Sequence, residues 1–403
     1  MFNQVTLLTQ SLWRDEAFSV LLSIRPLREI AVITARDYSP PFYYFILHFW
    51  IGLFGWSEPA LRLLSILFTI LACVVIYFLG KKMFSNQVGL VSAVLLFLVP
   101  PVFYYSFEVR MYTLFIFLAV LSFYFLISEK WLLFILTSLA GLYTHNFMLF
   151  SLGGEILAYL AWKDWKLPKK NFVLSCLALG LGYFPWLGVL ISQFTSVQRS
   201  FWLNRPSWGW LFLAISGLFF LSIVFLKTKN PSEKALALWG ILPFSFTVFI
   251  SYFVPLFHLR YFLFAFPPLI CLLCSFLLSL QWNKVLSSTL VILFLCVNLN
   301  IWFKPDKSDI RTRLEPLLKS GSREQVVCAS ILNYFETKYY LLRFSPQMVE
   351  NLYLLESGWV HHAGGSLVDQ SKLLHDLPEE GFLVEESGGI KKLETGNYRL
   401  DSE

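Results

Sequence analysis

Two adjacent carboxylates stand near the start of the chain, in the stretch Ser11-Leu-Trp-Arg-Asp-Glu-Ala-Phe18. Asp15 and Glu16 follow Arg14, and an aromatic residue stands on either side of the three. A carboxylate can act as a general base, and an arginine can stabilise negative charge that develops on a leaving group. The same stretch also fits an ordinary charged lead-in to a helix. The rest of the chain decides between these two interpretations.

The composition is that of an integral membrane protein. Hydrophobic residues make up 57% of the 403 residues and charged residues only 14%, against about 25% charged in soluble domains. A charged side chain within a membrane is costly and is often functional. Residues 304–403 differ, because they hold 12 Lys and Arg against 16 Asp and Glu, whereas residues 1–303 hold 20 against 10. We therefore expect a small soluble domain after the membrane part.

Apolar runs predict about ten membrane spans. Residues 17–37 mix apolar and charged side chains and predict an interfacial helix, and the run 42–56 is too short for a span and is expected to lie along the surface. Three parts follow: residues 1–60 as an outer first loop with the acidic motif, 61–303 as the transmembrane domain, and 304–403 as an α/β domain. The spans are expected at about 61–80, 88–106, 110–128, 131–145, 147–162, 171–193, 208–227, 236–256, 260–280 and 284–303.

The last hundred residues show short patterns of both helix and strand. Residues 325–330 predict a buried strand, and residues 381–385 and 398–400 predict further short strands. Residues 332–343 and 366–377 predict helices. The predicted fold class is an all-α polytopic membrane protein with interfacial helices and a small C-terminal α/β soluble domain.

Lysine and arginine are segregated along the predicted topology. All eleven lysines of residues 1–303 fall at one side of the spans, and all nine arginines fall at the other. Positive residues in short loops mark the cytoplasmic face, so the lysine side is predicted to be cytoplasmic and the arginine side, with the tail, extracytoplasmic. An arginine can hold two oxygens of one phosphate or carboxylate. Four acidic residues are predicted at the same face: Asp15, Glu16, Asp37 and Glu108. A site is therefore expected there.

A carboxylate beside arginines at a membrane surface suits the transfer of a sugar from a lipid phosphate. The phosphate is already a good leaving group, so the reaction needs a base on the acceptor and cations on the departing phosphate. Six motifs resemble glycosyltransferase family 39 in the order of that family, whose polytopic GT-C enzymes include protein mannosyltransferases and the lipid A aminoarabinose transferase. The motifs lie at residues 11–17, 37–44, 57–63, 105–112, 143–145 and 260–268.

The resemblance runs through most of residues 11–270, is strongest before residue 150, and is loose in the tail. It implies a polyprenyl-phosphate sugar donor and an inverting transfer, on the extracytoplasmic side of the cell membrane, to a lipid, glycan or protein acceptor. It implies Asp15 as the catalytic base, with Glu16 beside it and Glu108 in the second acidic motif. Donor-phosphate contacts are expected from Arg110, Tyr112, Arg260 and Tyr261, and further substrate contacts from Asp37, His145, Trp202 and His258.

Two departures limit what is carried over. The family has a membrane span directly before its first acidic motif, where this chain has twelve residues. The family also often has a histidine before Pro-Pro, where this chain has Ser39, so a role of that histidine is not carried over.

Other interpretations of single residues stay open. His145 at a span junction could be a structural hydrogen-bonding residue, Glu155 could pair with a neighbouring helix, and Trp202 could belong to an interfacial belt. No cofactor and no nucleic acid is expected, while a divalent metal stays open. The alternative function is a lipid or solute transporter or flippase. That class predicts polar residues within the spans, whereas here the charge lies almost wholly at the outer face.

Overall fold

The computed structural model describes residues 6–163, 170–200, 205–254, 256–280, 283–303, 307, 309–320, 324–356 and 367–393. The chain divides into two compact units. The first combines Met1–Asp37, Tyr44–Leu61 and Phe303–Glu403, and we call it the α/β unit. The second combines Tyr38–Tyr43 and Arg62–Trp302, and we call it the bundle unit. The N-terminal helices are thus grouped with the C-terminal part of the chain.

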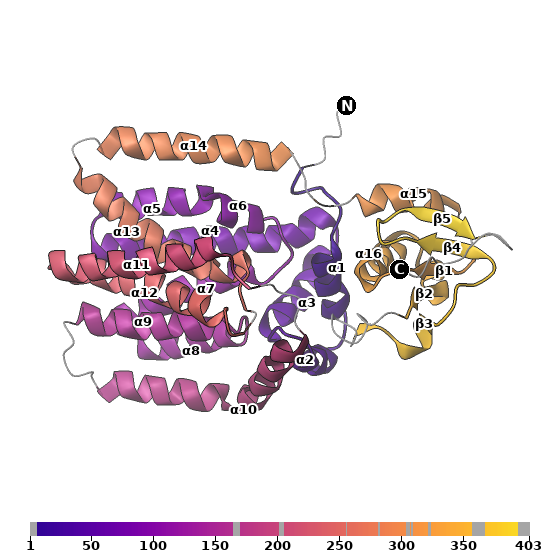
Figure 1. Cartoon of the computed structure of the whole chain (residues 1–403), viewed down its shortest axis with the longest axis horizontal. Helices are drawn as coiled ribbons and strands as arrows, with labels where there is room; N and C mark the ends of the chain where they lie inside the picture. Colours follow the sequence, from indigo (N-terminus) through magenta and orange to yellow (C-terminus); the bar gives the residue numbers. More distant parts are fainter. Residues whose placement is uncertain are drawn as a thin grey trace. The chain divides into compact units, whose positions relative to one another are not determined.

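A helix occupies each of the ten predicted spans (Figure 1). Among the described residues, five helices are long and apolar enough to cross a membrane, and shorter apolar helices accompany them. The helices are α4 (Glu58–Met83), α5 (Asn86–Leu98), α6 (Pro100–Tyr105), α7 (Tyr112–Ile127), α8 (Trp131–Leu142), α9 (Met148–Trp162), α10 (Lys170–Ser200), α11 (Trp208–Lys227), α12 (Pro231–Ile250), η1 (Leu259–Ala265), α13 (Phe266–Ser279) and α14 (Asn283–Phe303).

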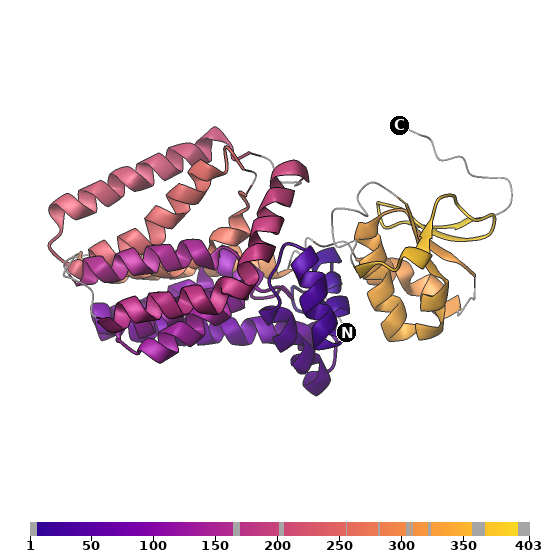
Figure 2. The same ribbon diagram turned by 90° about the horizontal axis from the view of Figure 1, so that it is seen from below.

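Prolines lie within several of the predicted spans, among them 88–106 and 171–193. The run 88–106 is divided into α5 and α6 because Val99 is extended and Pro100 begins a new helix, in which its missing N–H and fixed φ are tolerated. Helix α10 carries Pro185 in its interior. Such a proline removes one backbone hydrogen bond and bends a helix. Figure 2 shows α10 continuing in a different direction in its second half.

A buried carboxylate links three helices of the bundle unit. Glu155 of α9 is wholly buried. Its two oxygens accept hydrogen bonds from the hydroxyl groups of Ser122 on α7 and of Ser151 one turn earlier on α9. Ser151 in turn accepts a hydrogen bond from the indole N–H of Trp239 on α12, at 3.1 Å. Glu155 thus pairs with neighbouring helices, which is the structural interpretation of this residue given in the sequence analysis.

The α/β unit contains N-terminal helices and a small sheet. Its elements are α1 (Arg14–Ser23), α2 (Leu27–Arg36), most of α3 (Phe42–Phe54), α15 (Ile310–Ser320), β1 (Val326–Cys328), α16 (Ile331–Phe344), η2 (Pro346–Asn351), β2 (Leu352–Leu355), η5 (Gln370–Lys372), β3 (Leu373–Leu374), β4 (Gly381–Val384) and β5 (Ile390–Leu393). The sheet order is β3-β2-β1-β4-β5, with β5 antiparallel to β4 and the other neighbours parallel. Val327 in the central strand pairs with Tyr353 and Leu383. Helix α16 connects β1 towards β2 and packs on α1.

The sequence predicted one element of this unit wrongly. In place of a helix over residues 366–377, the described residues form the short turn η5 and then β3, which pairs with β2. Pairing at a sheet edge outweighs the weak helical pattern of so short a segment. The strand predicted at 398–400 lies outside the described residues. The sequence reading did not anticipate α15, β2 or β5.

The Glu155 network predicts an order of stabilities. In Glu155→Leu the hydroxyl groups of Ser122 and Ser151 lose a buried acceptor, at a cost of about 1–3 kcal/mol. Glu155→Gln keeps the shape and one acceptor oxygen and should cost less. Thermal unfolding of both variants in detergent checks this order, and a Leu variant as stable as the wild type would contradict it.

Candidate active site

The first acidic motif forms the first turn of α1. Arg14, Asp15 and Glu16 are its first three residues, so Asp15 and Glu16 point in different directions around the helix. The Asp15 carboxylate lies 3.3 Å from the Arg14 guanidinium, and 19% of its side chain is exposed. Glu16 is wholly buried. Of the two neighbouring carboxylates, Asp15 is therefore the one that solvent or a substrate can reach.

Glu16 is held by a residue that follows the last apolar helix. One of its oxygens lies 3.1 Å from the Lys307 ammonium, whose side chain is also buried. The same oxygen accepts the backbone N–H of Trp13 at 3.3 Å. The Lys307 ammonium also lies 5.6 Å from the centroid of the Trp13 ring. These contacts fix the start of α1.

Further contacts join the acidic motif to α15 and α16. The backbone N–H of Leu12 donates to the Tyr340 hydroxyl at 2.9 Å, and the Ser11 hydroxyl donates to Asp309 at 2.6 Å. The buried carboxylate of Glu58, in the third resembling motif, pairs with Arg343 and, at 3.2 Å, with Arg311. Glu58 thus has a structural role within the α/β unit.

A second group of predicted residues gathers in the bundle unit. Arg110 lies two residues before the start of α7, and its guanidinium carbon lies 6.0 Å from the centroid of the Tyr112 ring. The guanidinium carbon of Arg260, on η1, lies 5.7 Å from the same centroid and 5.5 Å from that of Tyr261. Tyr112 and Arg260 are both buried. Two guanidinium groups that are 150 residues apart in the chain therefore meet at one aromatic ring.

Glu108 is also buried, at 2% exposure. Its backbone carbonyl accepts the Arg110 N–H at 2.8 Å and the hydroxyl of Ser65 on α4. The backbone between Glu108 and Arg110 is thereby anchored to a neighbouring helix. This contact fixes the position of the Arg110 backbone, from which its side chain extends.

His145 belongs to the same group. Its ring stacks on Phe115 at 4.8 Å between centroids, and lies 6.0 Å from Tyr112 and 5.4 Å from Tyr261. Burial, followed by the charges of Arg110 and Arg260, lowers its pKa to about 3. The imidazole is therefore neutral at physiological pH. Its Nδ1 accepts the backbone N–H of Phe147 at 3.1 Å.

The remaining predicted residues are less central. Asp37 ends α2 and donates its backbone N–H to Ile33. His258 caps η1 through a hydrogen bond from the Arg260 N–H at 3.3 Å, and its ring lies 5.7 Å from that of Tyr261. Trp202 lies outside the described residues. Within the described residues, no group of three His, Cys, Asp or Glu could hold a metal ion.

The predicted residues fall into two sets. Asp15, Glu16 and Asp37 belong to the α/β unit, and the others that the structure describes belong to the bundle unit. That the acidic residues of both sets form one site stays a prediction. The sequence did not single out Lys307. The feature of the sequence that could have pointed to Lys307 is its place in a short charged run after the last predicted span.

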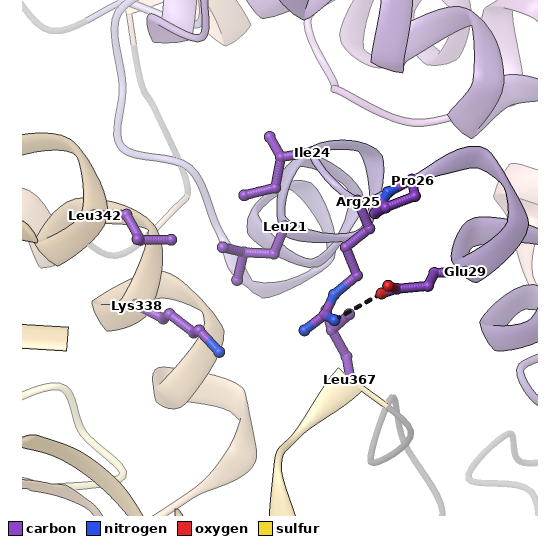
Figure 3. Close-up of a pocket in the computed structure, with 8 residues that line it drawn as sticks. All are labelled: Leu21, Ile24, Arg25, Pro26, Glu29, Lys338, Leu342 and Leu367. Atoms are coloured by element: carbon purple, nitrogen blue, oxygen red, sulfur yellow. Dashed lines mark hydrogen bonds and ion pairs between the residues drawn. The ribbon is translucent and has the colours of Figure 1, made fainter. Parts of the chain in front are cut away.

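A pocket lies where α1 and α2 meet α16 in the α/β unit. Figure 3 shows the Arg25 guanidinium and the Lys338 ammonium at the same opening, with apolar side chains around them. Arg25 pairs with Glu29 at 3.0 Å. Burial, followed by the charge of Arg25, lowers the pKa of Lys338. Because Arg25 already pairs with a carboxylate, we assign the pocket no part in the reaction.

The comparisons with known proteins agree with this fold. Residues 38–188 match the family model described as dolichyl-phosphate-mannose-protein mannosyltransferase. The apo structure of ArnT from Cupriavidus metallidurans aligns with a TM-score of 0.63, and the structure of that protein bound to undecaprenyl phosphate aligns with 0.59. Each alignment covers 95% of this chain and 90% of that chain at 12% identity. Among curated proteins, none matches the chain in sequence.

The chain is therefore a multi-pass membrane protein with the GT-C fold, and the predicted fold class is confirmed. Its resemblance to the protein mannosyltransferases and ArnT, which are membrane glycosyltransferases, is confirmed as well.

The lowered pKa of His145 predicts a pH dependence of stability. Between about pH 6.5 and 3 the unfolded chain binds a proton at this residue and the folded chain does not, so stability falls as the pH falls. His145→Asn keeps an acceptor for the Phe147 N–H but cannot be protonated. Melting temperatures from pH 7 to 4 should fall less steeply in the variant, and equal slopes would contradict the assignment.

Proposed function

We propose that the chain is a glycosyltransferase that moves a sugar from a polyprenyl-phosphate donor to an acceptor on the extracytoplasmic face. The observation that carries this proposal is the pair Arg110 and Arg260 at the Tyr112 ring, in a chain with the GT-C fold. ArnT, which shares this fold, has a structure with bound undecaprenyl phosphate. A lipid phosphate is the ligand whose charge and several oxygens two guanidinium groups would match.

The site must bind the donor phosphate more strongly as the sugar leaves. When the bond between the anomeric carbon and the phosphate oxygen breaks, the electron pair stays on that oxygen, and the phosphate gains negative charge. Arg110 and Arg260 would stabilise this charge, and partial burial makes the stabilisation larger than in water. Neutral His145 beside them adds no third positive charge, and the rings of Tyr112 and Tyr261 hold the two guanidinium groups.

The acceptor needs a base. Asp15 is proposed to take the proton of the acceptor nucleophile, which attacks the anomeric carbon from the face opposite the phosphate, so that the configuration inverts. Asp15 is suited to this because its carboxylate is partly exposed, whereas Glu16 is buried against Lys307. We therefore propose Asp15 as the base and Glu16 as a residue that holds the helix start. The sugar and the acceptor are not assigned.

Replacement of the base should remove turnover. Asp15→Asn keeps the shape of the side chain but not its basicity, so transfer should fall roughly 10²–10⁴-fold while donor binding is largely kept. A transfer assay with a polyprenyl-phosphate sugar measures both quantities. Glu29→Gln, which changes an exposed carboxylate of α2, is the control and should leave transfer unchanged. Near-full transfer in Asp15→Asn together with its loss in Glu16→Gln would move the role of base to Glu16.

The two arginines should not tolerate lysine. Arg110→Lys and Arg260→Lys keep the positive charge but lose the planar group that binds two phosphate oxygens, so donor affinity should fall about tenfold or more in each. Arg205→Lys, at an exposed residue of the same unit, is the matched control. Unchanged donor affinity in both variants, with the protein correctly folded, would refute the role in phosphate binding.

A further inference from the structure

The segment that leads into α1 is held by a hydroxyl group from α16. The backbone N–H of Leu12 donates to the Tyr340 hydroxyl at 2.9 Å, and both residues are wholly buried. The Tyr340 hydroxyl in turn donates to Oε1 of Glu58 at 3.2 Å. A phenol can make both bonds at once, since its oxygen carries one proton and also accepts. One oxygen atom thus links the first resembling motif to the third, from a residue 328 positions beyond Leu12.

The carboxylate that accepts the Tyr340 proton is itself held by two positive charges. Glu58 is 2% exposed, and it pairs with Arg343 on α16 and, at 3.2 Å, with Arg311 on α15. A carboxylate buried without such partners would be costly, whereas here two guanidinium groups and a phenol supply its hydrogen bonds. Because the groups of this buried network satisfy one another, the Tyr340 hydroxyl is held in one position.

Helix α16 contacts α1 at a second point. The ring of Phe18, in the second turn of α1, meets the ring of Phe335 edge to face, with 5.5 Å between centroids and 72° between planes. Leu12 lies two residues before α1 begins, so α16 contacts the chain on both sides of Asp15. A short helix that is held at two points cannot turn about its own axis. The direction in which the partly exposed Asp15 side chain points is therefore set by α16.

We propose that Tyr340 is a positioning residue for Asp15, through which the last hundred residues take part in sugar transfer. This inference rests on the proposed function, because the direction of Asp15 matters to transfer only if Asp15 acts as the base. A base must lie within hydrogen-bond reach of the proton that it takes, and a displacement of about 1 Å can reduce the rate about 100-fold. Loss of the Tyr340 hydroxyl releases the Leu12 N–H and lets the start of α1 move.

Tyr340→Phe in the full-length protein tests the proposal. The variant keeps the ring, which stacks on Phe344 with 2° between planes, and removes the hydroxyl alone. Turnover should fall roughly 10- to 100-fold, as expected for a displaced catalytic group. The KM for the donor should stay unchanged, because the proposed phosphate contacts belong to the bundle unit. Tyr353→Phe is the matched control and should keep full turnover, since the Tyr353 ring lies 5.0 Å from the Lys372 ammonium and phenylalanine keeps this contact.

A second control separates a loss of position from a loss of stability. Leu383→Ala removes a buried side chain from β4 in the same unit, so it should lower the melting temperature at least as much as Tyr340→Phe does. At a temperature at which both variants are folded, Leu383→Ala should keep its turnover and Tyr340→Phe should not. Full turnover in Tyr340→Phe would overturn the proposal. An equal loss of turnover in both variants would also overturn it, because that result indicates a structural role alone.

Hydrogen exchange at the Leu12 amide separates this proposal from the proposed function. In the wild type this buried and hydrogen-bonded amide should be protected, and in Tyr340→Phe its protection should fall together with that of residues 13–18. If protection falls in this way while Asp15→Asn transfers sugar normally, the proposed base is wrong and Tyr340 only holds α1. If the Leu12 amide exchanges as fast in the wild type as in Tyr340→Phe, the positioning contact is refuted directly, whichever residue is the base.

Discussion

The convergence of Arg110 and Arg260 on the Tyr112 ring is the contact on which the site of the bundle unit depends. Two like charges in a largely buried place repel each other, so the fold has to hold them there. Helix α4 fixes one arginine, because its Ser65 hydroxyl donates to the backbone carbonyl of Glu108, and η1 fixes the other through the cap of His258. Burial, followed by the charges of the two arginines, keeps His145 neutral. The result is a site in which two arginines supply positive charge and aromatic rings surround them. Such a site suits the phosphate of an amphipathic donor.

The α/β unit holds the short N-terminal acidic motif in place. Helix α1 has only ten residues and would be marginal alone. Helix α1 packs on α16, and its buried Glu16 pairs with Lys307, while the buried Glu58 of the same unit pairs with Arg343. Removing one partner of such a buried pair costs far more than the pair itself contributes, so these contacts specify a single arrangement. The C-terminal part of the chain is in this sense part of the support of the acidic motif.

Much of this fold could be predicted from the sequence, because long apolar runs admit little besides membrane helices. The helices at residues 61–303 followed from this, and motif resemblance named the arginines that the structure brings together. The tail was harder, since strands of two to four residues carry little pattern, and β3 was mistaken for a helix. The pairing of Glu16 with Lys307 could not be found because the two residues are almost 300 positions apart in the chain. Nor could the sequence separate Asp15 from Glu16, which differ in burial and in the side chains that pair with them.

The measurement that tests the central claim most directly is the fate of a polyprenyl-phosphate sugar incubated with the purified protein in lipid vesicles. The account predicts that the bond between sugar and phosphate is broken, so that free polyprenyl phosphate accumulates and the sugar appears on an acceptor with inverted anomeric configuration. A panel of donors with different sugars, together with a cell-envelope extract as the source of acceptor, covers the choices that the structure leaves unassigned. Movement of intact donor between the two leaflets, without release of polyprenyl phosphate from any donor, would contradict the account and indicate a flippase.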